Sequence, residues 1–99
     1  MMLQYKTQHM NETLDLKIKS VAANIRKIRE HRNYTQEYLA AKLNISQNAY
    51  SKIELGYTKI TVERLFQIAI ILEVDPVDFI NIANNKEIQS FNTSLASNQ

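Results

Sequence analysis

A single glycine, Gly56, and a single proline, Pro76, are present in the 99 residues of this chain. Tight turns between strands depend on these two residue types, so a fold of many short strands is hard to build from this sequence. Helices joined by short connections need fewer of them. The chain also has no cysteine, which excludes disulfides and Cys-based zinc sites and suits a reducing compartment. The sequence therefore predicts an all-α fold with one modest core.

Apolar residues recur at the spacing of three and four that marks one face of a helix. Val21, Ile25 and Ile28 place the first helix over residues 20–32. Side chains suited to later helix starts occur at four places: Thr35, Ser46, Thr61 and Asp75. Together they predict a compact five-helix bundle.

The two ends of the chain differ from this pattern. Residues 1–16 are polar without a sustained period, which predicts a loose N-terminal arm, either disordered or a helical lead-in to the first helix. Residues 84–99 are rich in Asn, Ser, Gln and Thr, which predicts a polar C-terminal tail. The tail has three apolar residues at roughly helical spacing, Ile88, Phe91 and Leu95, so an extra helix that docks on a partner is an alternative there. The expected organisation is a domain over residues 17–83 between flexible N- and C-terminal extensions.

Basic and acidic residues are segregated along the chain. Residues 17–33 carry six basic side chains against Glu30 alone, whereas residues 60–85 carry Arg64 against four acidic side chains. Such polarity orients a molecule toward a polyanion. On charge alone, a solvated surface explains it equally well.

Signals for an enzyme or a cofactor site are missing. His9 and His31 are the only histidines, and neither lies in a His-Glu-x-x-His motif, so neither a zinc site nor a His-based catalytic pair is predicted. Asp75 and Asp78 could be paired carboxylates, but their place at a helix start favours capping. We predict no catalytic residue, no metal and no cofactor. Without an apolar run of about 20 residues or an export signal, a cytoplasmic location is expected.

The most informative stretch runs from Thr35 to Gly56 and predicts a helix, a sharp reversal and a second helix. The outer face of that second helix is polar and consists of Gln47, Asn48, Ser51 and Lys52. The DNA major groove is about 12 Å wide and admits one α-helix, in which Asn and Gln can bond adenine and Lys can bond guanine. These four residues are therefore predicted to contact bases. The alternative is an ordinary solvated face.

Several features at fixed spacing carry a family resemblance: Thr35-Gln36 at the start of the second helix, Ala40 at the helix crossing, Asn44 at the reversal, and Ile53-Glu54-Leu55-Gly56 at the end of the third helix. With these features, residues 21–82 resemble the helix-turn-helix domain of the Cro/repressor (XRE-like) family. The family usually has Gly in place of Asn44, Ile or Val in place of Tyr50, and often a polar residue in place of Leu55. The resemblance implies a lambda-repressor-like bundle with the helix at residues 46–55 in the major groove.

The resemblance also suggests roles around that helix. Gln36 is placed against the DNA backbone, and further candidates for phosphate contact are Arg26, Tyr57, Thr58 and Lys59. Each of these could equally be plain surface. Related repressors pair an Arg with a Glu at the positions of Arg29 and Glu54, which implies a structural ion pair between the first and third helices.

We therefore interpret the chain as a prokaryotic or phage-like regulator, with repression preferred over activation, that binds operator DNA as a sequence-specific protein and acts at the nucleoid. Operators usually present two half-sites about 34 Å apart, which a homodimer matches. A candidate dimer patch consists of Leu55, Val62, Phe66 and Ile70, although these could also be surplus core residues. Two other classes stay open: an antitoxin-type module that binds a toxin and its own operator, and a sequence-tolerant RNA or nucleoid binder.

Overall fold

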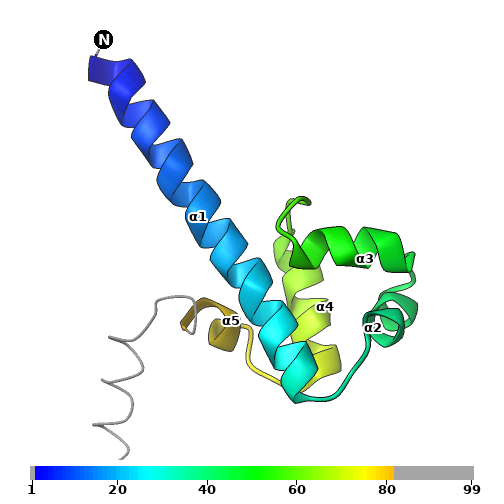
Figure 1. Cartoon of the computed structure of the whole chain (residues 1–99). Helices are drawn as coiled ribbons and strands as arrows, with labels where there is room; N and C mark the ends of the chain where they lie inside the picture. The colour runs from blue at the N-terminus through cyan, green and yellow to red at the C-terminus, as the bar shows by residue number, and fades with distance from the viewer. Residues whose placement is uncertain (1, 82–99) are drawn as a thin grey trace, which may run out of the picture.

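The computed structural model describes residues 2–81, with side chains from residue 6 onward, and all regular secondary structure within that range is helical (Figure 1). Five helices follow one another: α1 (Met2–His31), α2 (Gln36–Leu43), α3 (Gln47–Glu54), α4 (Val62–Leu72) and α5 (Val77–Asn81). The prediction of an all-α, five-helix domain is confirmed. The predicted C-terminal tail at residues 84–99 lies outside the described residues.

Helix α1 differs most from the expectation, because it begins at Met2 and runs for 30 residues. Of the two forms expected for the N-terminal arm, the structure has the helical lead-in over residues 2–16. The segment contains neither Gly nor Pro and is rich in good helix formers, and Asp15 and Lys19 form an ion pair of 3.5 Å at the favourable spacing of four residues. Residues 6–17 are all exposed, so no core dictates an apolar period there. Figure 1 shows this part of α1, in blue, projecting beyond the other helices.

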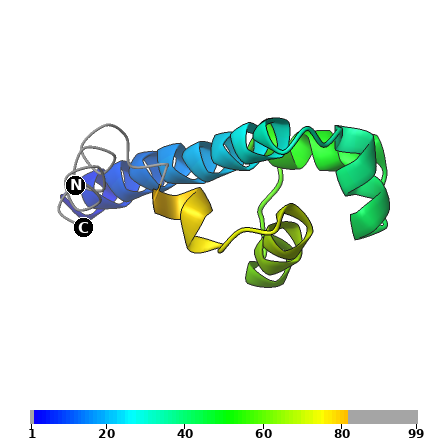
Figure 2. The same cartoon turned by 90° about the horizontal axis from the view of Figure 1, so that it is seen from below.

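The other helices pack around the second half of α1. Figure 2 shows α1 and α3 along one side of the molecule and α4 and α5 along the other. One cluster of buried side chains joins all five helices: Ile25, Leu39, Ala40, Leu43, Tyr50, Ile53, Ile68, Ala69, Leu72 and Phe79. Helix α5 is also fixed by the buried amide of Asn24, whose Nδ2 donates to the carbonyl oxygen of Phe79 at 2.9 Å. None of the described helices combines the length and the apolar character needed to cross a membrane.

Local chemistry sets the helix starts as predicted. The hydroxyls of Thr35, Ser46 and Thr61 each accept a hydrogen bond of 3.0 Å from the backbone N–H three residues later. These bonds satisfy donors that an α-helix leaves unpaired in its first turn. They fix where α2, α3 and α4 begin.

The reversal between α2 and α3 depends on Asn44. Its backbone is left-handed, with φ 59° and ψ 43°, and it ends α2 at the predicted residue. The next residue, Ile45, donates its N–H to the carbonyl of Ala40 at 3.0 Å and packs its side chain against the core. The turn therefore both closes α2 and anchors the chain before α3.

This conformation gives a first test. A residue with a Cβ and no local side-chain bond costs about 1–2 kcal/mol in the left-handed region, which Gly enters freely. We expect Asn44→Ala to lower the free energy of unfolding by about 1 kcal/mol and Asn44→Gly to leave it nearly unchanged. Urea unfolding followed by circular dichroism measures both. Equal losses for the two variants would contradict this account of the turn.

Candidate nucleic-acid interface

Helix α3 exposes its polar face and buries the other. Gln47, Asn48 and Lys52 are exposed and Ser51 is half-buried, whereas Tyr50 and Ile53 lie in the core. The structure thus places all four residues predicted to contact bases on the face of α3 that the core does not cover. The first turn of the helix, just after the Ser46 cap, is the most open part.

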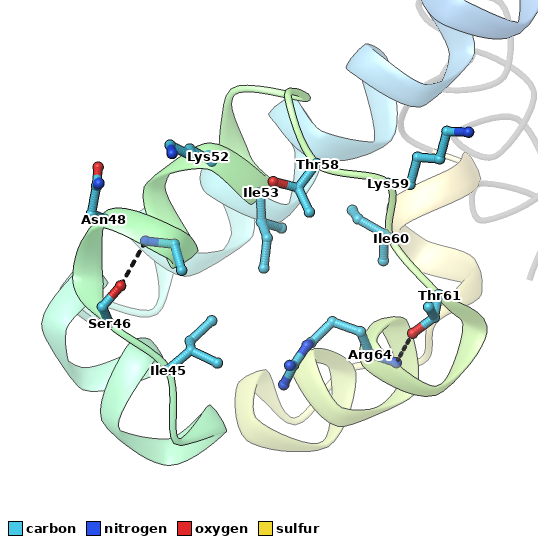
Figure 3. A pocket seen from close by; sticks show the side chains of 11 residues that line it. Ile45, Ser46, Asn48, Lys52, Ile53, Thr58, Lys59, Ile60, Thr61 and Arg64 are labelled. Atoms are coloured by element: carbon cyan, nitrogen blue, oxygen red, sulfur yellow. Dashed lines mark hydrogen bonds between the residues drawn. The ribbon is translucent and has the colours of Figure 1, made fainter.

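A groove of about 410 Å³ lies between α3 and the segment that leads into α4 (Figure 3). It is lined by Ile45, Ser46, Asn48, Ala49, Lys52, Ile53, Thr58, Lys59, Ile60, Thr61 and Arg64. In Figure 3, Asn48 and Lys52 point outward from α3, while Arg64 extends from α4 into the gap. The groove therefore joins two predicted base contacts, Asn48 and Lys52, to two predicted phosphate contacts, Thr58 and Lys59.

All charged side chains that line this groove are positive. Its lining includes the cations Lys52, Lys59 and Arg64 and no acidic residue. Nη1 of Arg64 donates to Oε1 of Gln67 at 3.0 Å and, at 3.5 Å, to the carbonyl of Leu43 at the end of α2. A guanidinium has five N–H donors, so these bonds orient the group without using up its donors. Such a rim suits an anionic ligand.

Arg64 did not emerge from the sequence as a site residue, because there it counts only as one cation in an acidic segment. Its one local signal is its place three residues after the Thr61 cap, which puts it in the first turn of α4. Only the folded chain brings that turn opposite α3.

The remaining predicted phosphate contacts lie outside the lining of this groove. Tyr57 is 75% exposed in the loop after α3. Gln36 is half-buried and its Nε2 donates to Oε1 of Glu54 at 3.0 Å. Arg26 is exposed and forms an ion pair of 3.3 Å with Glu30 on the same helix. An amide has two N–H donors and an acceptor, so the bond to Glu54 leaves Gln36 able to bind a phosphate as well.

The expected ion pair between α1 and α3 is present and buried. Nε and Nη2 of Arg29 donate to Oε2 and Oε1 of Glu54 at 2.6 and 3.1 Å, and the two side chains are 10% and 2% exposed. Nη1 of Arg29 donates further to the carbonyl of Tyr34 at 2.7 Å. With Gln36 on α2, the network ties α3 to both preceding helices, so it holds the candidate reading helix in place.

The pair shifts the titration of both partners. The hydrogen bond with Glu54 raises the pKa of Arg29 above its ordinary value, so the guanidinium stays charged. Burial alone would raise the pKa of the Glu54 carboxyl, but the hydrogen bonds from its neighbours, that of Arg29 above all, outweigh burial and lower this pKa. Both groups are therefore ionised near neutral pH.

Tyr50, where the related family usually has Ile or Val, lies fully buried beside this pair. Its hydroxyl has no partner within hydrogen-bond geometry among the described residues. Burial, reinforced by the nearby Glu54, raises the pKa of Tyr50 above its ordinary value, so the phenol stays neutral. The ring fills the core, and the hydroxyl lies close to Glu54 without a well-formed hydrogen bond.

Of the two carboxylates at the start of α5, Asp75 caps the helix. Oδ1 of Asp75 accepts the backbone N–H of Val77 at 3.0 Å, and Asp78 lies in the first turn. Within residues 2–81, no group of three or more His, Asp or Glu residues is placed to hold a metal ion.

Comparison with known proteins agrees with this geometry. A family model described as helix-turn-helix matches residues 25–79, more than half of the chain. The matched region begins in the second half of α1 and ends within α5, so it excludes the projecting part of α1. No curated protein matches the chain.

The ion pair predicts a dependence of stability on pH. Because the pKa of Glu54 is lower in the folded chain than the value of about 4.3 for an unfolded one, the pair stabilises the fold above that pH and loses this effect as pH falls through the folded pKa. Glu54→Gln leaves Arg29 buried without a counter-charge and should cost about 3–5 kcal/mol at neutral pH. Urea unfolding should show this difference shrinking below about pH 4. A difference that is constant with pH would contradict the assignment.

Because the Tyr50 hydroxyl has no hydrogen-bond partner among the described residues, its removal should not destabilise the fold. Tyr50→Phe removes only a buried polar atom without a partner, so the free energy of unfolding should stay the same or rise by up to about 1 kcal/mol. Tyr50→Ala, the control for the ring, should lose about 3–5 kcal/mol through the cavity it leaves. Thermal unfolding of the three proteins measures both effects. A clear loss in Tyr50→Phe would mean that the hydroxyl is bonded in solution.

Proposed function

Because the chain belongs to the Cro/C1-type helix-turn-helix family of DNA-binding transcription regulators, we propose that it binds a specific operator in double-stranded DNA and represses transcription there. The observation that carries this proposal is the exposed polar start of α3 beside a cationic groove without acidic residues. On one surface, side chains that can hydrogen-bond to base edges therefore lie next to side chains that can bind phosphates.

In this proposal α3 lies in the major groove with its first turns against the base edges. Gln47 and Asn48 can each bond the N6 and N7 atoms of an adenine, and Lys52 can bond the acceptors of a guanine. Ser51 can donate or accept. The buried opposite face of α3 supports this docking, because it prevents the helix from rotating about its own axis.

Phosphate contacts fix the register of such a helix. Lys59 and Arg64 enclose the groove from the side of α4, and Thr58 adds a hydroxyl to its lining. We assign Arg64 to the phosphate contacts together with the sequence-based candidates Gln36, Arg26, Tyr57, Thr58 and Lys59. Arg26 has the least structural support, because an ion pair with Glu30 already engages it.

A homodimer would present two copies of α3 to the two halves of an operator. The residues of the candidate dimer patch support this part of the proposal, because all four are exposed: Leu55 51%, Val62 67%, Phe66 50% and Ile70 74%. They do not belong to the core of one chain. Large exposed apolar side chains at steps of four on one helix, as Val62, Phe66 and Ile70 are on α4, favour a protein contact.

Mutations separate base readout from phosphate contact. Operator DNA would first be selected from a random duplex pool. Asn48→Ala and Lys52→Ala should then each cost about 1–3 kcal/mol in operator affinity and relax preference at particular base pairs. Fluorescence anisotropy with operators substituted at single positions measures this. Unchanged base preferences in both variants would refute the readout assignment.

The phosphate contacts predict a different signature. Lys59→Ala and Arg64→Ala should weaken binding to operator and random DNA alike, and each should flatten the dependence of log K on log salt by about one. Lys27→Ala removes an exposed cation of α1 that does not line the groove and is the matched control. If Lys27→Ala reduced the slope as much as Arg64→Ala, the special role of the groove would be refuted.

A further inference from the structure

The apolar face of α1 continues past the end of the domain. Ile25 belongs to the core and Val21 packs against it. Leu14 and Met10 follow toward the N-terminus on the same helical face, given 100° per residue. They are 51% and 59% exposed. One apolar stripe thus serves the core in the second half of α1 and is uncovered in the projecting half.

At the base of the projecting half lies a second groove, of about 480 Å³. It is lined by Leu14, Lys17, Ile18, Val21, Lys59, Ile60, Thr61, Val62 and Leu65. Beyond it, Val62, Phe66 and Ile70 follow one another at steps of four residues along the outside of α4. We call the combined surface of Met10, Leu14, Val62, Phe66 and Ile70 the corner surface, and residues 6–17 the projecting segment.

The apolar part of this surface favours a partner contact. The projecting segment belongs to a continuous helix of 30 residues, but Met10 and Leu14 stay 59% and 51% exposed on it. Covering one large apolar side chain removes on the order of 100 Å² from water. Two corner surfaces covered together would therefore bury on the order of 1,000 Å² before any polar rim is counted, close to the area of a stable interface.

We propose that the partner is a second copy of this chain, and that two copies exchange their projecting segments. The Met10 and Leu14 face of each copy packs on Val62, Phe66 and Ile70 of the other. This inference rests on the proposed homodimer and deepens it, because it adds α1 to an interface that the sequence places on Leu55 and α4.

Charge favours this occupant. On the projecting segment the cations Lys6 and Lys17 lie beside the apolar stripe, whereas Glu12 and Asp15 lie farther round the helix, given 100° per residue. Along the exposed stripe of α4, Glu63 follows Val62, and Glu73 lies at the end of the helix, where it pairs with Arg32 at 3.9 Å. The cation Lys59 lines the groove next to Val62. Packing the segment with its lysines against Glu63 and Glu73, away from Lys59, brings opposite charges together.

The rival arrangement is direct pairing of two projecting segments. Antiparallel pairing about Met10 and Leu14 would bring Lys6 of one copy near the partner's Lys17, and like charges at this range are unfavourable. It would also leave the α4 stripe uncovered. Exchange onto α4 avoids both problems.

The test measures the association of the full chain without DNA by sedimentation equilibrium. Leu14→Glu and Val62→Glu should each raise the dimer dissociation constant about tenfold or more, because each places a charge in the apolar centre of the interface. Leu16→Glu is the matched control: Leu16 is 68% exposed on the same helix but faces away from the stripe. Circular dichroism checks that every variant is folded, and Leu14→Ala keeps the test decisive if Leu14→Glu unfolds the segment.

Mixing the two variants gives the sharpest result. Leu14→Glu acts mainly on the segment and Val62→Glu mainly on the α4 stripe, although both residues line one groove. A mixed dimer keeps one contact between an unaltered segment and an unaltered stripe, whereas either homodimer keeps none. An equimolar mixture should therefore associate more tightly than either variant alone.

Three outcomes would overturn the proposal. A wild-type chain that stays monomeric up to about 100 µM excludes a dimer of useful strength. Loss of association in Leu14→Glu but not in Val62→Glu indicates direct pairing of the segments. If Leu16→Glu weakened association as much as Leu14→Glu, the apolar stripe would not be the part of α1 that forms the interface. None of these depends on DNA, so the base preference of Asn48→Ala tests the proposed function separately.

Discussion

A buried ion pair between Arg29 and Glu54 connects the parts of the structure that matter for DNA. Oppositely charged groups removed from water are costly unless their remaining donors and acceptors are satisfied. Here the guanidinium reaches Glu54 and the Tyr34 carbonyl, and the carboxylate also accepts from Gln36. These hydrogen bonds have defined directions, so they fix the positions of α1, α2 and α3 relative to one another. Packing of apolar side chains alone would define these positions less precisely.

The Arg29–Glu54 pair also determines which face of α3 is exposed. With Glu54 tied inward and Tyr50 and Ile53 in the core, only one face of α3 is left for solvent. The chain then returns past that face to the Thr61 cap, which places Arg64 within 3.5 Å of the carbonyl at the C-terminus of α2. A cation is favoured beside a helix C-terminus. The cationic groove next to α3 is thus a product of helix ends and capping as much as of the basic residues themselves.

Local rules predicted much of this structure. The Thr35, Ser46 and Thr61 caps and the left-handed Asn44 follow from side-chain chemistry within a few residues, and the Arg29–Glu54 pair followed from the family resemblance. Two features were not predicted from the sequence. Residues 2–16 form a helix without a core beside them. Only Met10 and Leu14 continue the apolar stripe of Val21 and Ile25 there, and two residues do not mark a helix by themselves. The N–H groups of Gln36 and Arg64 have partners far away in the sequence. Such contacts depend on how the helices cross, which periodicity does not specify.

The length of α1 has a meaning beyond its own stability. Leu14 and Arg29 are 15 residues apart on one continuous helix, a span of about 22 Å along its axis. One end is fixed to α3 through the ion pair, and the other reaches the corner surface. In the proposed dimer a rigid helix therefore links the protein contact to the reading helix, so the exchanged segments would set the separation of the two α3 helices. Operator half-sites recur at about 34 Å, one turn of DNA, or its multiples. In such a dimer, a bend in α1 between Leu14 and Arg29 would change that separation and leave each α3 intact. The proposed exchange therefore assigns half-site spacing, rather than base preference, to the N-terminal half of α1.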